Sequence, residues 1–331
     1  MNKRHARGTR KPNRREFGAA IATGFFAESI GRTGISAASP GSRMNLCVFS
    51  KHLQWLDYEE MAATAVELGF DGVDLTVRPG GHVEPDRVKR DLPRAIKAIR
   101  AAGLEIPMIT TAITDATSPA SVAVLEAAAQ QGIGHYRMGY FRYEPAQSIS
   151  ETLDLARKKL EKLEVLNRRL GICGDYQNHA GSRYVGASVW DLRELLGGLD
   201  PRWLGCQFDI RHATVEGGLS WSTDFKAVTA RTHTLVLKDF RWQLVGEDWS
   251  VENCPIGSGM VRFKEFFELL KASGFSGPVS LHFEYALGGA DHGARQLESD
   301  AETVLRAMRG DVAAVRQLLT PDSSPLRNPF D

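Results

Sequence analysis

The chain has 331 residues, of which 43% are hydrophobic and 24% charged, and its formal net charge is +1. This composition suits one large or two ordinary globular domains, and the near-neutral charge argues against a surface that binds nucleic acid. The four cysteines are far apart and form no CxxC pair, which indicates buried free thiols rather than a disulfide scaffold or a zinc site.

Residues 1–43 differ from the rest of the chain. They are rich in basic and small residues, and the pair Arg14-Arg15 precedes a mildly apolar run at 18–27. This pattern resembles a twin-arginine signal and predicts export of the folded protein to the periplasm; the alternative is a disordered basic tail on a cytoplasmic protein. The run is too short to span a membrane, and Glu28 interrupts it, so we expect no membrane span.

Short apolar segments followed by helical patterns recur eight times between residues 44 and 310. The predicted strands lie at residues 45–50, 69–75 (with a leading turn), 106–111, 135–139, 172–178, 203–209, 234–239 and 278–284. The predicted helices lie at residues 58–68, 91–102, 118–131, 148–170, 189–199, 225–230, 263–273 and 294–308. Several of these helices end before glycine, as a left-handed C-cap requires.

This alternation predicts a parallel sheet, and eight units predict a single-domain (β/α)8 TIM barrel over residues 44–310, with residues 311–331 as a C-terminal tail. The alternative is a doubly wound open sheet. That fold would carry a glycine-rich fingerprint after its first strand, where this chain has Phe-Ser-Lys-His at 49–52. We therefore favour the barrel and expect no nucleotide cofactor.

Polar residues gather where the predicted strands end, which is the end of a parallel barrel where ligands bind. The side chains expected to contact a ligand there are Lys51, His52, Arg78, His82, Arg137, Asn178, His179 and Arg211. Asp209 and Arg211 would share one face of a strand because side chains alternate, although they could instead form a local ion pair. His135 and His233 fall near strand starts, where we expect structural roles.

Five segments carry a resemblance to a known family. They are Phe-Ser-Lys-His-Leu (49–53), Tyr-Gln-Asn-His (176–179), Phe-Asp-Ile-Arg-His (208–212), Leu-Lys-Asp (237–239) and Gly-Pro-Val-Ser-Leu-His-Phe-Glu (277–284). Over residues 44–308 the chain resembles the sugar phosphate isomerase/epimerase family of xylose isomerase-like barrels. The resemblance implies one divalent metal held by Glu, Asp, His and Glu on strands five to eight, with the two glutamates moving protons on opposite faces of a sugar.

The chain departs from that ligand set at three of four positions. Asp209 matches the aspartate, and His212 matches a substrate-contacting histidine, but Gln177, Val236 and His282 stand where Glu, His and Glu are expected. A glutamine cannot carry a proton near neutral pH, and a valine cannot bind a metal. The resemblance leaves Asp209, Gln177 and His282 as candidate ligands for weakly bound Mn²⁺ or Mg²⁺, with Glu284 as a further carboxylate.

The resemblance therefore implies a sugar or keto-sugar isomerase or epimerase that abstracts a proton next to a carbonyl. The candidate catalytic residues are His212, His282, Lys238 and Glu284. Imidazole suits proton transfer and an ammonium stabilises an enolate oxygen. A keto-sugar lyase and a non-catalytic sugar-binding barrel with a degenerate metal site are the alternatives, and a homo-oligomer is an open expectation.

Overall fold

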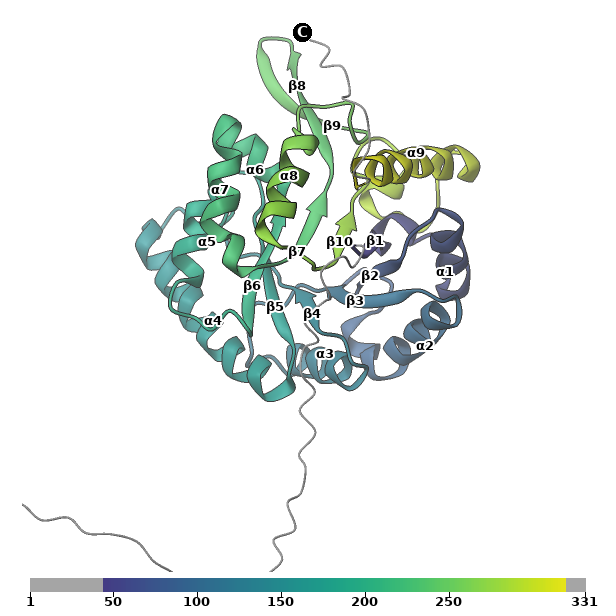
Figure 1. Cartoon of the computed structure of the whole chain (residues 1–331). Helices are drawn as coiled ribbons and strands as arrows, with labels where there is room; N and C mark the ends of the chain where they lie inside the picture. The colour runs from purple at the N-terminus through teal and green to yellow at the C-terminus, as the bar shows by residue number, and fades with distance from the viewer. Residues whose placement is uncertain (1–43, 320–331) are drawn as a thin grey trace, which may run out of the picture. The chain divides into compact units, whose positions relative to one another are not determined.

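Eight parallel strands close into a barrel in the computed structural model, which describes residues 44–319 (Figure 1). They are β1 (Leu46–Phe49), β2 (Gly72–Thr76), β3 (Glu105–Thr110), β4 (His135–Arg137), β5 (Cys173–Gln177), β6 (Leu204–Asp209), β7 (Thr232–Leu237) and β10 (Val279–Leu281). Around the barrel their order is β1, β10, β7, β6, β5, β4, β3, β2. The (β/α)8 prediction is confirmed, whereas the predicted export signal lies outside the described residues and stays a prediction.

Helices surround the barrel. They are α1 (Tyr58–Glu67), α2 (Val88–Ala101), α3 (Pro119–Gln130), α4 (Ile149–Leu170), α5 (Val189–Leu196), α6 (Ile210–Gly217), α7 (Trp221–Val228), α8 (Phe263–Ser273) and α9 (Ala301–Leu319). The longest, α4, begins with a capping box between Ser148 and Glu151 and ends at Gly171, whose φ is 69°. None of the described helices is long and apolar enough to cross a bilayer.

The chain differs from the predicted elements at its C-terminal end. The last helix was expected at residues 294–308, with a tail from residue 311, but α9 continues to Leu319. Val312 and Val315 are buried in the main hydrophobic core. The predicted end of the last helix at residue 308 is therefore wrong, because the apolar face that holds this helix on the barrel extends past it.

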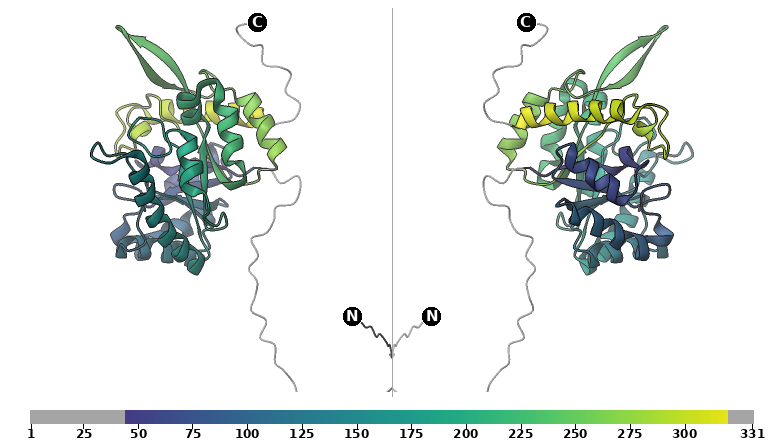
Figure 2. Two further views of the ribbon diagram at one scale, coloured as in Figure 1. Left: turned by 90° about the vertical axis from the view of Figure 1, so that its left-hand side faces the viewer. Right: turned by 90° about the vertical axis from the view of Figure 1, so that its right-hand side faces the viewer.

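A hairpin of β8 (Asp239–Val245) and β9 (Asp248–Cys254) follows β7 and was not predicted. It extends beyond the ring of helices (Figure 2). Its tight turn contains Gly246 with φ 65°, and alternating polar and apolar residues on either side of this turn are typical of a hairpin. At its base, the Asp239 carboxylate accepts hydrogen bonds from the backbone N–H groups of Phe240, Gly257, Gly259 and Val261.

The entry to β10 leaves no room for a side chain at Gly277. A Cβ added there would lie 1.9 Å from the backbone oxygen of His233. We expect Gly277→Ala to lower the free energy of unfolding by about 1–3 kcal/mol in urea denaturation, because backbone must move to relieve the clash. Gly134→Ala is the matched control, since a Cβ there meets nothing within 4 Å. Equal stability of the two variants would contradict this account.

Candidate active site

A buried ammonium lies at the C-terminal end of the barrel. Lys238 directly follows β7, and its Nζ lies 2.8 Å from His212 Nε2, 3.0 Å from Glu284 Oε2 and 3.1 Å from Asp209 Oδ2. Although burial opposes the charge, the two carboxylates raise the pKa of Lys238 above its ordinary value. The site is therefore organised around a charged lysine with two carboxylate partners.

Asp209 ends β6 and begins α6. Its Oδ1 accepts a hydrogen bond of 3.0 Å from the backbone N–H of His212, so it is the N-cap of the helix. The expectation that Asp209 and Arg211 share a strand face is wrong, because the chain is already helical at Ile210. Asn178 pairs with the backbone of Asp209 through its Oδ1 (2.7 Å) and Nδ2 (3.0 Å), which fixes the strand end instead of leaving this amide free for a ligand.

His212 is buried beside the ammonium. Burial, followed by the charge of Lys238, holds its pKa well below the usual range, so its ring is neutral. Its Nε2 lies 2.8 Å from Lys238 Nζ and its Nδ1 lies 2.9 Å from Arg211 Nη1, so both ring nitrogens are engaged by cationic side chains. The ring of His179 lies against it, with centroids 4.1 Å apart and planes tilted by 35°, and burial and Lys238 lower the pKa of His179 to about 3. In this arrangement His212 holds the lysine and has no free Nε2 to take a proton.

Glu284 lies at the more accessible edge of the site, with 25% of its side chain exposed. Its Oε1 accepts a hydrogen bond of 3.1 Å from Lys51 Nζ, while Oε2 contacts Lys238. Burial opposes the charged form, but Lys238 and Lys51 hold the pKa of Glu284 well below its ordinary value. Glu284 is thus a carboxylate bridging two lysines.

His282 is the one predicted catalytic residue whose ring nitrogens are both without a hydrogen-bond partner. The ring is 5% exposed, stacks on Phe49 with centroids 4.2 Å apart, and places Nδ1 3.7 Å from Glu284 Oε1. Burial, with a contribution from Lys238, lowers the pKa of His282 to about 3. A buried, neutral and unpartnered imidazole is available to a ligand. The Arg78 guanidinium lies 5.5 Å from the centroid of the Phe49 ring, on which His282 stacks.

Gln177 lies across the site at the end of β5. Its Oε1 accepts hydrogen bonds from Arg137 Nη1 (3.2 Å) and from the Tyr140 hydroxyl, while its Nε2 donates to Asp209 Oδ2 (2.8 Å). The amide oxygen is the only atom of this side chain that could bind a metal. It faces Arg137 and Tyr140 instead of Asp209.

The residues at this end of the barrel do not fit a divalent metal. The candidate ligands Asp209, Gln177 and His282 do not point at a shared open position: Lys238 Nζ contacts the Asp209 carboxylate, and the Gln177 oxygen is engaged elsewhere. The ammonium of Lys238 therefore supplies the positive charge that the largely buried carboxylates of Asp209 and Glu284 need.

Two residues that were predicted to contact a ligand, His52 and His82, instead bind other parts of the protein around the site. His52 is fully buried, and its Nδ1 lies 3.0 Å from the Ala290 oxygen while its Nε2 accepts from the Phe283 N–H at 3.0 Å. Both ring nitrogens of His52 are thus engaged by backbone. His82 Nδ1 lies 3.2 Å from Ser50 Oγ, and burial lowers the pKa of His82 to about 4.

Sequence reasoning missed one residue that connects the site to the hairpin. Asn253, on β9, accepts a hydrogen bond of 2.6 Å from Arg211 Nη2 and donates one of 3.1 Å to the backbone oxygen of Glu284. Arg211 therefore contacts the hairpin. The alternating residues around Gly246 were the sequence signal for the hairpin, but they do not show that Asn253 reaches the backbone of Glu284.

Comparisons with known proteins agree with this architecture. The chain is similar to 3-keto-D-glucoside 4-epimerase YcjR from E. coli, with a TM-score of 0.61 and 17% identity over 83% of this chain and 99% of that one. It is also similar to a D-allulose 3-epimerase from Methylomonas sp., with a TM-score of 0.63 and 14% identity over 83% of this chain and 98% of that one. A third similar structure is a xylose isomerase-like TIM barrel protein from Mycobacterium smegmatis in complex with magnesium. Its TM-score is 0.56, with 15% identity over 79% of this chain and 88% of that one.

These identities are low, so the structural likeness establishes the fold. No curated protein matches the chain in sequence. The family model described as Xylose isomerase-like TIM barrel matches residues 62–308, which is most of the barrel. On this match, the chain belongs to the xylose isomerase-like TIM barrel family.

Proposed function

We propose that the chain is an isomerase- or epimerase-like enzyme that acts on a sugar or keto-sugar by abstracting a proton next to a carbonyl. The observation that carries this proposal is the Lys238 ammonium, buried between two carboxylates, one of which, Glu284, lies 3.7 Å from the unpartnered ring of His282. The names of similar structures, which include two sugar epimerases, support the substrate class.

In this proposal the substrate carbonyl oxygen accepts a hydrogen bond from Lys51, which contacts Glu284 through one N–H. The three N–H groups of Lys238 are engaged by His212, Glu284 and Asp209, so Lys238 acts on the substrate through its charge. When the neighbouring carbon loses its proton, negative charge develops on that oxygen, and the two ammonium groups stabilise the enolate. The neutral imidazole of His282 takes the proton and returns it. Its pKa of about 3 keeps the ring in the proton-accepting form at neutral pH. No step passes through a metal.

The proton-carrying groups favour chemistry on one side of the substrate. His282 and Glu284 both follow β10, whereas Gln177 at the end of β5 cannot carry a proton. Return of the proton to the adjacent carbon gives an isomer. Departure of a leaving group from the next carbon gives an elimination product, so a keto-sugar lyase is the second candidate. Inversion between two opposed carboxylates does not fit these residues.

The test is an exchange assay in deuterated water. Purified protein is incubated with a panel of keto-sugars, and proton NMR follows both loss of the C–H signal beside the carbonyl and formation of product. We expect exchange with at least one sugar, and the product then distinguishes isomer from elimination product. Sugar binding detected by calorimetry without exchange for any member of the panel would contradict the proposal and support a non-catalytic sugar-binding barrel.

A further inference from the structure

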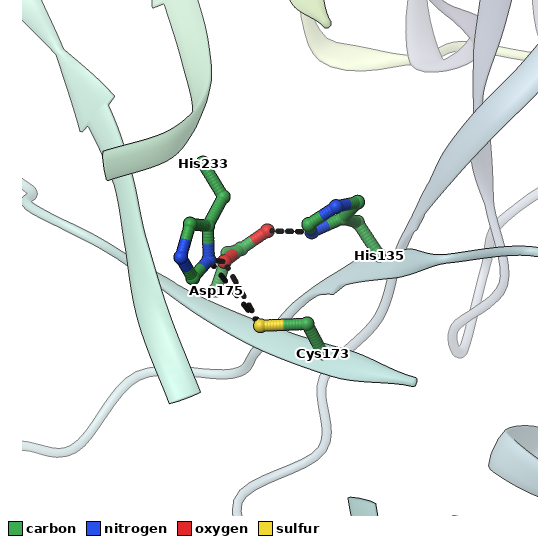
Figure 3. A group of neighbouring side chains, drawn as sticks. All are labelled: His135, Cys173, Asp175 and His233. Atoms are coloured by element: carbon green, nitrogen blue, oxygen red, sulfur yellow. Dashed lines mark hydrogen bonds and ion pairs between the residues drawn. The ribbon is translucent and has the colours of Figure 1, made fainter. Parts of the chain in front are cut away.

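A second cluster of side chains lies at the opposite end of the barrel, where the strands begin. It consists of His135 on β4, Cys173 and Asp175 on β5, and His233 on β7, and we call it the N-terminal cluster (Figure 3). Cys173 and Asp175 share one face of β5 because residues two apart on a strand point the same way. The register of β4 and β5 pairs His135 with Cys173, which brings the first histidine alongside.

The four side chains already contact one another. Asp175 lies between the two imidazoles, with Oδ2 2.9 Å from His135 Nδ1 and Oδ1 2.8 Å from His233 Nδ1. Cys173 Sγ lies 3.3 Å from His233 Nδ1 and 3.7 Å from Asp175 Oδ1. One donor atom from each residue lies within 4.8 Å of all the others, and within residues 44–319 no other group of at least three His, Cys, Asp or Glu side chains meets this test.

We propose that the N-terminal cluster binds one Zn²⁺ ion through two imidazole nitrogens, a thiolate and a carboxylate. Zinc takes four such ligands in a tetrahedron, where neighbouring donor atoms lie about 3.3–3.6 Å apart. The distances from the Asp175 oxygens to the two histidine nitrogens, 2.9 and 2.8 Å, are shorter than this spacing. Other pairs of donor atoms in the cluster are up to 4.8 Å apart, which is longer. Small rotations about side-chain bonds therefore bring all four atoms to one ion.

The protons balance without any co-reactant. When zinc binds, the Cys173 thiol releases its proton, and each imidazole that binds through Nδ1 carries its remaining proton on Nε2. Asp175 binds as a carboxylate, the form that pairs with both imidazoles, so it has no proton to release. Binding is therefore expected to release at least one proton and to strengthen as pH rises.

The surroundings leave a path for the ion and space for its ligands. The side chains of His135 and His233 are 27% and 23% exposed, so solvent reaches the cluster, whereas Asp175 is fully buried. Gly205 on β6 lies against the second histidine, and a Cβ there would lie 2.1 Å from His233 Nδ1. The glycine thus makes room for the ring that supplies one ligand.

The test is a Co²⁺ titration of the full-length, reduced protein after treatment with chelator. Cobalt replaces zinc in tetrahedral sites and shows a charge-transfer absorption when a thiolate is bound. We expect one equivalent of Co²⁺ with this absorption and one equivalent of Zn²⁺ retained on dialysis, measured by mass spectrometry of the metal. Cys173→Ser should lose the absorption and weaken Zn²⁺ binding at least 100-fold.

Two controls locate the ion. Cys254→Ser changes a buried cysteine outside the cluster and should bind as the parent does. Asp209→Asn alters the opposite end of the barrel and should also retain the ion. If Cys173→Ser does not fold by circular dichroism, His233→Gln replaces it as the test variant. The proposal is overturned if the parent retains no zinc, if the cluster variant binds as the parent does, or if only Asp209→Asn loses the metal.

Discussion

Lys238→Ala is expected to lower turnover by about 10²–10³-fold, the loss typical for removal of one group that stabilises an oxyanion. It is also expected to lower the free energy of unfolding by about 3–5 kcal/mol at pH 7. The reason is that Asp209 and Glu284 would lose the cation they share while remaining largely buried. Turnover is measured by the exchange assay and stability by urea denaturation, with Lys226→Ala, at an exposed lysine, as the control.

The stability loss should depend on pH in a defined direction. Glu284 has a lowered pKa in the parent, so its ion pairs stabilise the fold above about pH 4.5, and this contribution is lost as the pH falls through the folded-state pKa. Without Lys238, both carboxylates would instead take up protons more readily in the folded state, which favours the variant at low pH. The gap between parent and variant should therefore narrow from pH 7 to pH 4. A gap that stays constant, or normal turnover, would contradict the central role of the ammonium.

His282→Ala is expected to lower turnover by about 10²–10⁴-fold, which is the usual contribution of a group that transfers a proton. Because neither ring nitrogen has a hydrogen-bond partner, the replacement breaks no hydrogen bond, and circular dichroism should show an intact fold. His282→Gln, which keeps a polar side chain that cannot carry a proton, should be as inactive. His292→Ala, at an exposed histidine, serves as the control.

The pH profile gives His282 a second test. Its pKa of about 3 means that the ring stays neutral from pH 8 to pH 5, so protonation of this base should not reduce kcat/KM in that range. The base is lost only when the pH approaches its pKa. Near-normal turnover in His282→Ala would instead assign proton transfer to Glu284, the nearest carboxylate.

The sequence predicted the barrel because its signals are local: helices end at glycines such as Gly171, and apolar strands recur between them. It also placed Lys238, His282 and Glu284 at the same end, because a parallel barrel brings all strand ends together. It could not place Lys238 between the carboxylates, since that position depends on side-chain geometry across three strands. The resemblance to the isomerase/epimerase family predicted a metal ion beside Asp209, but in this chain the ammonium of Lys238 contacts that carboxylate.

Other parts of the site depended on pairings that sequence spacing does not reveal. His52 adjoins Lys51 in the chain, yet its ring contacts the backbone of Phe283 and Ala290, more than 200 positions away by residue separation. The N-terminal cluster depends on the strand register of the barrel, which brings His135 beside Cys173. The cysteines are free and buried as expected, but their separation along the chain gave no sign that Cys173 lies beside His135 and His233 in the closed barrel.

The anchoring of the hairpin makes it a natural point for engineering. The carboxylate of Asp239 holds the base of the hairpin through four backbone N–H groups, none of which belongs to the outer part of the ribbon. Trp242, Leu244 and Trp249, farther out, are exposed. We therefore expect the protein to tolerate shortening of the outer ribbon, or its replacement by a graft, provided that Asp239 and Asn253 remain. Phe240 is buried in the main core and lies under the Arg211 guanidinium, so any such change should begin beyond this residue.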